Sequence, residues 1–221
     1  MRNPYELGYA GSASVATRSG LLAKVSGLLA FSMAFTAAGA VVGARYPGLG
    51  FAAMIGVLIL SFVVSLARNV SGLNLVLLYT LTTLMGVALG GIIELYLAAG
   101  AGVIVLQAAG TTGVLTLGLS AYALTTKSNL ASWGSKLFIP LLGLIAASVV
   151  GIFVHATILE IVIGLGGAIL FSFYLVYEIN QARFVENTLG NAILVSVGIY
   201  LSIINIFLSL LRLFTALDSR N

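Results

Sequence analysis

Cysteine is absent from the sequence, and histidine occurs once, as His155. Without cysteine there can be no disulfide framework and no thiolate metal site, and a zinc enzyme lacks ligands. An intramembrane serine protease is also not favoured, because it needs a base beside its nucleophile and the sequence has a single histidine. We interpret the single histidine, which falls in a short segment between apolar runs, as a surface residue. We therefore expect no enzyme and no bound cofactor.

Charged residues are also scarce, at 7% of the 221 residues, whereas 60% are hydrophobic. A soluble globular domain carries roughly 25% charged residues. A protein this poor in charge cannot cover its surface with polar groups. The composition therefore predicts an integral membrane protein whose main partner is the lipid bilayer.

The ten basic residues lie one or two at a time between apolar runs and form no basic stripe, so nucleic-acid binding is not expected. Positive charge favours the cytoplasmic side of a membrane. With the N-terminus inside, seven basic residues face the cytoplasm and three face outward. The former are Arg2, Arg18, Lys24, Arg68, Lys127, Lys136 and Arg183; the latter are Arg45, Arg212 and Arg220. This favours a cytoplasmic N-terminus and an outer C-terminus. A short N-terminus without a transit-like segment favours a bacterial cell inner membrane.

Seven apolar runs are long enough to span a bilayer, which needs about 20 residues each. They are Val25–Ala44, Leu49–Ala67, Leu73–Ala98, Gly102–Leu124, Leu137–Val154, Ile158–Tyr177 and Leu189–Phe214. The short connections force consecutive helices to run antiparallel. The expected fold is all-α: one seven-helix transmembrane domain over residues 1–221, with residues 1–20 as a short cytoplasmic N-terminal segment. The small residues that end the first run are also found in signal peptides, but six further spans favour a retained anchor.

Small and polar residues recur at helical spacing in four of the runs. In the last run they share one face, so we expect this helix to be central and polar-striped. That face holds Asn191, Gly198, Ser202, Asn205, Ser209 and Arg212. The stripe of the sixth run holds Glu160, Gly164, Gly167, Tyr174 and Glu178. The third run contributes Tyr79, Thr83, Gly86, Gly90 and Glu94, and the fourth contributes Gln107, Thr111, Gly118 and Tyr122.

Two interpretations of these stripes stay open. Small and hydroxyl-bearing residues favour close helix packing. Glu178, Arg68 and Gln107 equally fit a hydrated ion path, because a charge or amide at membrane depth needs a partner. Arg68 and Glu178 end their runs on the same side, so a salt bridge between them is one hypothesis, and Arg183 is a competing partner. Glu94 and Glu160 fit interfacial carboxylates.

The last two runs carry a family resemblance. Phe171-Ser-Phe-Tyr-Leu-Val-Tyr-Glu178 is similar to an F-S-x-Y-x-x-Y-D element. The stretch from Tyr200 to Arg212 is similar to Y-L-D-x-I-N-L-F-x-x-L-L-R, with Asn205 and Arg212 in place. Both elements are typical of the Bax inhibitor-1 (transmembrane Bax inhibitor motif) family. The length and the seven runs extend the resemblance over nearly the whole chain.

The resemblance implies a calcium leak across a membrane, or modulation of stress through a membrane-bound protease. In the family the leak is attributed to two aspartates that share a proton and to an arginine at the start of the third helix. These positions fall here on Glu178, Ser202 and Arg68, and a glutamate of some bacterial members falls on Gln107. Glu178 keeps a carboxylate, whereas Ser202 does not.

The loss of the second acid removes the coupling by which two carboxyl groups sense pH. Calcium binds several oxygen ligands, usually including carboxylates. Glu178, Ser202, Asn205 and Gln107 would supply oxygens but little negative charge, so Glu178 is the candidate for a transient calcium contact. We therefore expect a cation (calcium) leak channel with weakened pH sensing. The alternative is a non-conducting stress regulator that binds a membrane-bound protease or another membrane protein.

The sequence does not favour two other classes of seven-helix protein. A retinal photoreceptor needs a lysine deep in its last helix, and the lysines here are Lys24, Lys127 and Lys136. A secondary transporter commonly shows inverted repeats and broken helices, which seven spans with one internal proline, Pro140, do not favour.

Overall fold

The computed structural model describes residues 4–67, 71–154 and 156–219. Arg68 and His155 lie outside these ranges, so the hypotheses that concern them stay predictions. Within the described part of the chain the secondary structure is helical throughout. Seven of these helices are long and apolar enough to cross a membrane.

The helices follow the predicted runs closely. They are α1 (Pro4–Arg45), α2 (Gly50–Leu66), α3 (Ser71–Ala98), α4 (Gly102–Thr125), α5 (Trp133–Phe153), α6 (Thr157–Gln181) and α7 (Leu189–Asp218), with a short 3-10 turn at Pro47–Leu49. The largest differences are at helix ends. Helix α1 begins well before the predicted Val25, and α6 continues past the predicted end at Tyr177, which brings Glu178 into the helix.

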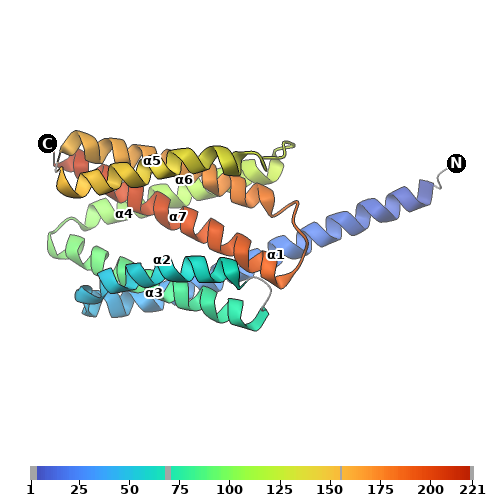
Figure 1. Ribbon diagram of the computed structural model, residues 1–221, viewed down its shortest axis with the longest axis horizontal. Helices are drawn as coiled ribbons and strands as arrows, with labels where there is room; N and C mark the ends of the chain where they lie inside the picture. The colour runs from blue at the N-terminus through green and yellow to red at the C-terminus, as the bar shows by residue number, and fades with distance from the viewer. Residues whose placement is uncertain (1–3, 68–70, 155, 220–221) are drawn as a thin grey trace.

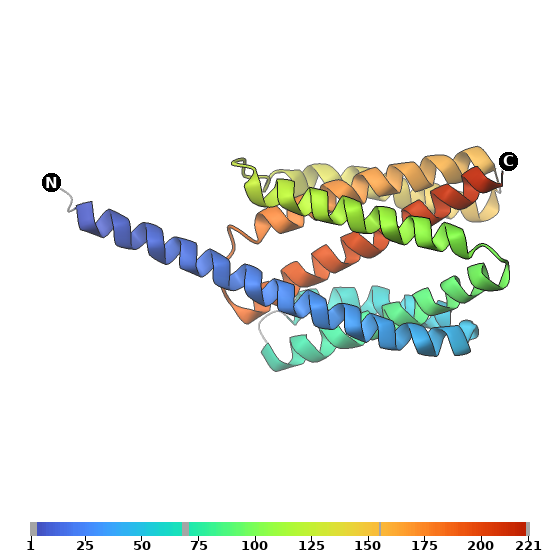
Figure 2. The same ribbon diagram turned by 180° about the vertical axis from the view of Figure 1, so that it is seen from behind.

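Helix α7 occupies the centre of the bundle. Helices α1–α3 lie on one side of it and α4–α6 on the other, as Figures 1 and 2 show from opposite directions. It packs against α1, α2, α3, α4 and α6. Its fully buried side chains include Ile193, Tyr200 and Ile206. Helices on the outside of the bundle, by contrast, expose large apolar side chains such as Phe62 and Leu117. A bilayer solvates this outward apolar surface. The burial of α7 and its contacts with five helices confirm the predicted central position of the last helix.

Close contact between α1 and α3 depends on four glycines, Gly39 and Gly43 on α1 and Gly86 and Gly90 on α3, which we call the glycine seam. A Cβ atom built at Gly86 would overlap the carbonyl of Thr36, and one built at Gly90 would overlap the carbonyl of Ala40. The seam confirms helix packing as the role of the glycines in the third-run stripe. The stacked rings of Phe35 and Tyr79, 4.7 Å apart, extend the same contact.

The loop between α4 and α5 is fixed to the end of α6. The fully buried Asn180 accepts a hydrogen bond from the backbone N–H of Leu130 (3.0 Å) and donates one to the carbonyl of Ser128 (3.1 Å). Arg183 donates to the carbonyls of Ala123 and Thr126 (3.3 and 2.6 Å). These two carbonyls lie at the C-terminal end of α4, where the helix leaves its last acceptors unsatisfied. Arg183 therefore caps α4.

Candidate functional site

Helices α6 and α7 bring the two polar stripes expected from the sequence face to face. A Cβ atom at Gly167 would overlap the hydroxyl of Ser209, and one at Gly164 would lie 2.9 Å from the backbone nitrogen of Leu213. At one end of the contact Arg212 forms an ion pair of 3.0 Å with Glu160. Both side chains are partly exposed, 38% and 29%, so this pair contributes little stability by itself. Its position is consistent with the antiparallel register that the glycine contacts of the two helices set.

Glu178 lies at the other end of this contact. Its carboxyl group packs directly on Gly198 of α7, where a Cβ atom would overlap it. The side chain is half-buried, and no salt bridge joins it to another residue within the described ranges. Arg183, the competing partner, caps α4 instead. Because α7 begins at Leu189, Gly198 lies about 14 Å inside that helix. The extension of α6 past Tyr177 is what allows Glu178 to reach this depth.

Ser202 and Asn205 follow Gly198 along α7. Ser202 is buried, 4% exposed, one turn or about 6 Å beyond Gly198. Asn205 is half-buried, and its amide nitrogen donates to the carbonyl of Leu201 in its own helix (2.8 Å). The structure therefore brings Glu178 and Ser202 to the same helix contact, with their positions offset by one turn.

Gln107 lies apart from this group. It is an exposed residue of α4 beside Phe214 of α7. Gly198 and Phe214 are sixteen residues apart in α7, so about 24 Å of helix separates the Gln107 region from Glu178. Of the five residues singled out from the sequence, the structure thus brings Glu178, Ser202 and Asn205 near one another. It places Gln107 elsewhere, and Arg68 lies outside the described residues.

A hydroxyl network that sequence reasoning missed joins α1, α3 and α7. The hydroxyl of Tyr200, a fully buried side chain, lies 2.7 Å from that of Thr36. The Thr36 hydroxyl also contacts the carbonyls of Ser32 (2.8 Å) and Thr82 (3.2 Å). A single tyrosine in an apolar run gives no sequence pattern that indicates its hydrogen-bonding partner. Only the packing of the three helices reveals this network.

Tyr200→Phe should lower the free energy of unfolding by about 1 kcal/mol, because it removes one buried hydrogen bond while keeping the ring. Thermal unfolding in detergent measures the change. Tyr122→Phe is the control, since Tyr122 is exposed on α4. Equal stability of the two variants would show that the Tyr200–Thr36 contact contributes nothing.

The geometry defines a class of protein: a polytopic integral membrane protein whose central helix packs a polar stripe against its neighbour. The family model described as inhibitor of apoptosis-promoting Bax1 matches residues 18–219. The chain therefore belongs to the Bax inhibitor-1 family.

Relatives occur in bacteria and in a virus. A Vibrio cholerae protein described as an uncharacterized membrane protein is 36% identical over 164 residues, which is 74% of this chain and 72% of the relative. An uncharacterized Campylobacter jejuni protein is 35% identical over 77% of this chain and 72% of its own length. A Golgi anti-apoptotic protein of Vaccinia virus (strain Lister) is 31% identical over 91% of this chain and 87% of its own.

Proposed function

We propose that this chain is a slow cation leak pathway that passes calcium, with Glu178 as the carboxylate that contacts the ion. The observation that carries the proposal is the position of the Glu178 carboxyl group on Gly198, about 14 Å inside α7. An ionisable group at membrane depth is costly and is by default a functional group. Gly198 has no side chain, so the Glu178 carboxyl group lies directly against the backbone of α7, within the contact between α6 and α7.

The chemistry around Glu178 favours a transient ion contact over a stable site. Calcium takes six to eight oxygen ligands, and affinity rises with the number of carboxylates. Glu178 is joined on this face of α7 by the Ser202 hydroxyl and the Asn205 amide oxygen, both uncharged. A single carboxylate attracts a cation without holding it, as a leak requires. The proposal assigns the chain no enzymatic activity and no cofactor.

The pH response of this pathway is proposed to be weak. Two carboxyl groups in contact share a proton and titrate as a pair. Ser202 replaces the second acid of the family pattern, so Glu178 has no carboxyl partner on α7 at this level. Protonation of Glu178 is then not coupled to a second group that could open the contact between α6 and α7.

The same proposal includes a bacterial inner membrane as the location, with the N-terminus in the cytoplasm and the C-terminus outside. An odd number of spans puts the two ends on opposite sides. The excess of basic residues on the N-terminal side supports the direction. In this orientation Glu178 lies in the cytoplasmic half of the membrane, and the Arg212–Glu160 pair lies near the outer surface.

Glu178→Gln is expected to reduce calcium influx to the level of empty liposomes. The purified chain is reconstituted into liposomes that contain a calcium-sensitive dye, and the initial rate is recorded. Glu186→Gln is the matched control, because Glu186 is an exposed carboxylate of the loop after α6. A wild-type leak that survives Glu178→Gln unchanged would remove Glu178 from the ion path.

A second candidate, a non-conducting regulator, is favoured by the absence of an acid at Ser202. In that case the chain acts by binding a membrane-bound protease or another membrane protein. The name of the viral relative, Golgi anti-apoptotic protein, is consistent with a regulatory role. The liposome assay separates the two functions, since a regulator alone leaves the calcium influx at the background rate in wild type and in both variants.

A further inference from the structure

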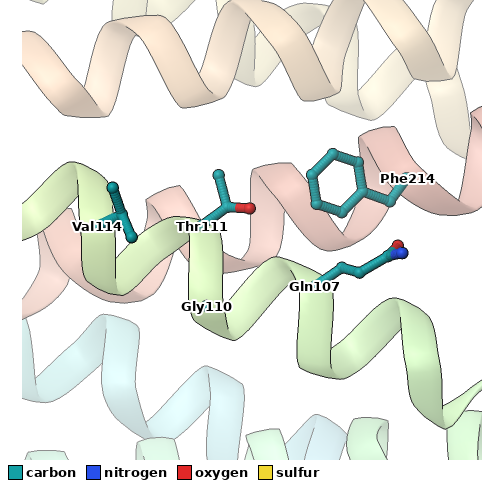
Figure 3. A pocket seen from close by; sticks show the side chains of 5 residues that line it. All are labelled: Gln107, Gly110, Thr111, Val114 and Phe214. Carbon is teal, nitrogen blue, oxygen red and sulfur yellow. The ribbon is translucent and has the colours of Figure 1, made fainter.

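A groove of about 630 Å³ opens between α4 and α7. Gln107, Gly110, Thr111 and Val114 of α4 line it together with Phe214 of α7 (Figure 3). Both helices are membrane spans and the groove is not enclosed. It therefore opens to the bilayer, in the half of the membrane away from Glu178.

Two polar side chains of the groove are unsatisfied within the protein. Gln107 is exposed, and neither its amide nor the Thr111 hydroxyl forms a hydrogen bond with another residue of the described ranges. The neighbouring Thr112, by contrast, donates to the carbonyl of Ala108 in its own helix (2.7 Å). A polar group without a partner is costly in hydrocarbon. We therefore expect the groove to bind a ligand that accepts hydrogen bonds.

The depth of Gln107 corresponds to the ester region of a lipid. Helix α4 has 24 residues and is about 36 Å long, slightly longer than the roughly 30 Å hydrocarbon core. Gln107 is five residues after Gly102, about 8 Å along the helix. Helical side chains lean toward the N-terminus, so its amide reaches toward the membrane boundary. Figure 3 shows this amide extending beside the Phe214 ring.

The deeper part of the groove has room for a hydrocarbon chain. A Cβ atom at Gly110 would have nothing within 4 Å. Val114 continues this surface one turn further along α4, with an exposed fraction of 73%. The residues thus change from hydrogen-bond donors near the boundary to apolar surface toward the centre, as a lipid changes from ester to acyl chain.

We propose that the groove binds one glycerophospholipid, with an ester carbonyl accepting a hydrogen bond from the Gln107 amide and an acyl chain lying along Gly110 and Val114. A lipid fits better than a helix from a second copy, because the backbone carbonyls of a helix are already satisfied internally. None of the five described residues that line the groove is charged, so the ester and not the headgroup charge is recognised.

Photocrosslinking of the full chain in nanodiscs tests the proposal. The probe is a trace of phosphatidylethanolamine with a diazirine near the ester end of one acyl chain, and peptide mass spectrometry maps the adducts. Gly110→Phe should fill the groove and abolish adducts there. Gly113→Phe is the matched control: Gly113 also has open space around it but points about 110° away from the groove on α4.

The bulk lipid tests the hydrogen bond. An ether-linked bulk lipid lacks the ester carbonyl, so it competes less well with the probe for the groove. The adduct yield of wild type in this lipid should be about fivefold higher than in an ester-linked bulk lipid, the factor that one hydrogen bond allows. Gln107→Leu should abolish this difference. Three results would overturn the proposal: adducts that Gly110→Phe leaves unchanged, equal yields in the two bulk lipids, or crosslinks at Gly110 between two copies of the chain.

Discussion

Gly90→Ala is expected to lower the free energy of unfolding by about 2 kcal/mol, the typical cost of forcing an extra group into a packed contact. The added methyl group would overlap the backbone of Ala40 in α1, where its carbonyl carbon and Cα would both lie 2.7 Å away. Backbone atoms cannot rotate aside as a side chain can. Helices α1 and α3 must separate, and the other contacts of the glycine seam weaken with them. Thermal unfolding of the purified protein in detergent measures the loss.

Gly27→Ala provides the control on the partner helix. A Cβ atom at Gly27 would have nothing within 4 Å, so the same methyl group meets no protein atom there. Alanine is also a better helix former than glycine, so this variant should be as stable as wild type or slightly more stable. If both variants unfolded at the same temperature, close approach of α1 and α3 would not be a source of stability.

Ser202→Asp is expected to make the calcium leak depend on pH, with faster influx at about pH 8 than at about pH 6, because it restores a pair of carboxyl groups. Ser202 is buried one turn from Gly198, on which the Glu178 carboxyl group lies. At acidic pH a shared proton would join α6 to α7. At higher pH the pair would lose this proton, and two carboxylates would repel each other across the contact. The influx rate in dye-loaded liposomes across this pH range measures the effect.

Ser202→Asn separates charge from size, since asparagine has the shape of aspartate without its titration. The leak of this variant should stay independent of pH. Equal pH profiles for Ser202→Asp and Ser202→Asn would show that position 202 does not interact with Glu178. This prediction rests on the leak proposed above, and a wild type that does not conduct would shift the question to the regulatory alternative.

The helices could be predicted from the sequence because hydropathy alone specifies where a chain crosses a bilayer. The seven runs match the seven spans, and the last helix, predicted to be central, packs against five others. Helical period and residue size suffice for such predictions.

Pairing between helices could not be read from the chain. The small residues around Gly39 and Gly43 were predicted to belong to a retained anchor, and nothing in the sequence indicated that they pack on α3. Gln107 was expected to share an ion path with Glu178, but the crossing of α4 and α7 places it beside Phe214. Asn180 binds a loop some fifty residues away in sequence. Each outcome depends on which faces meet in space, and periodicity within one helix does not contain that information.

The central position of α7 has a consequence for biosynthesis. Its span is 61% buried, compared with 11% for α5, yet the ribosome makes it after all five helices that pack against it. The α1–α3 group can close its glycine seam as soon as α3 is inserted. The space between that group and α4–α6, however, is filled only when the last helix arrives. Until then the Glu178 carboxyl group, which packs on α7 in the finished bundle, has to be solvated by water, lipid or an insertion factor. Assembly of the complete bundle therefore has to wait until α7 is inserted.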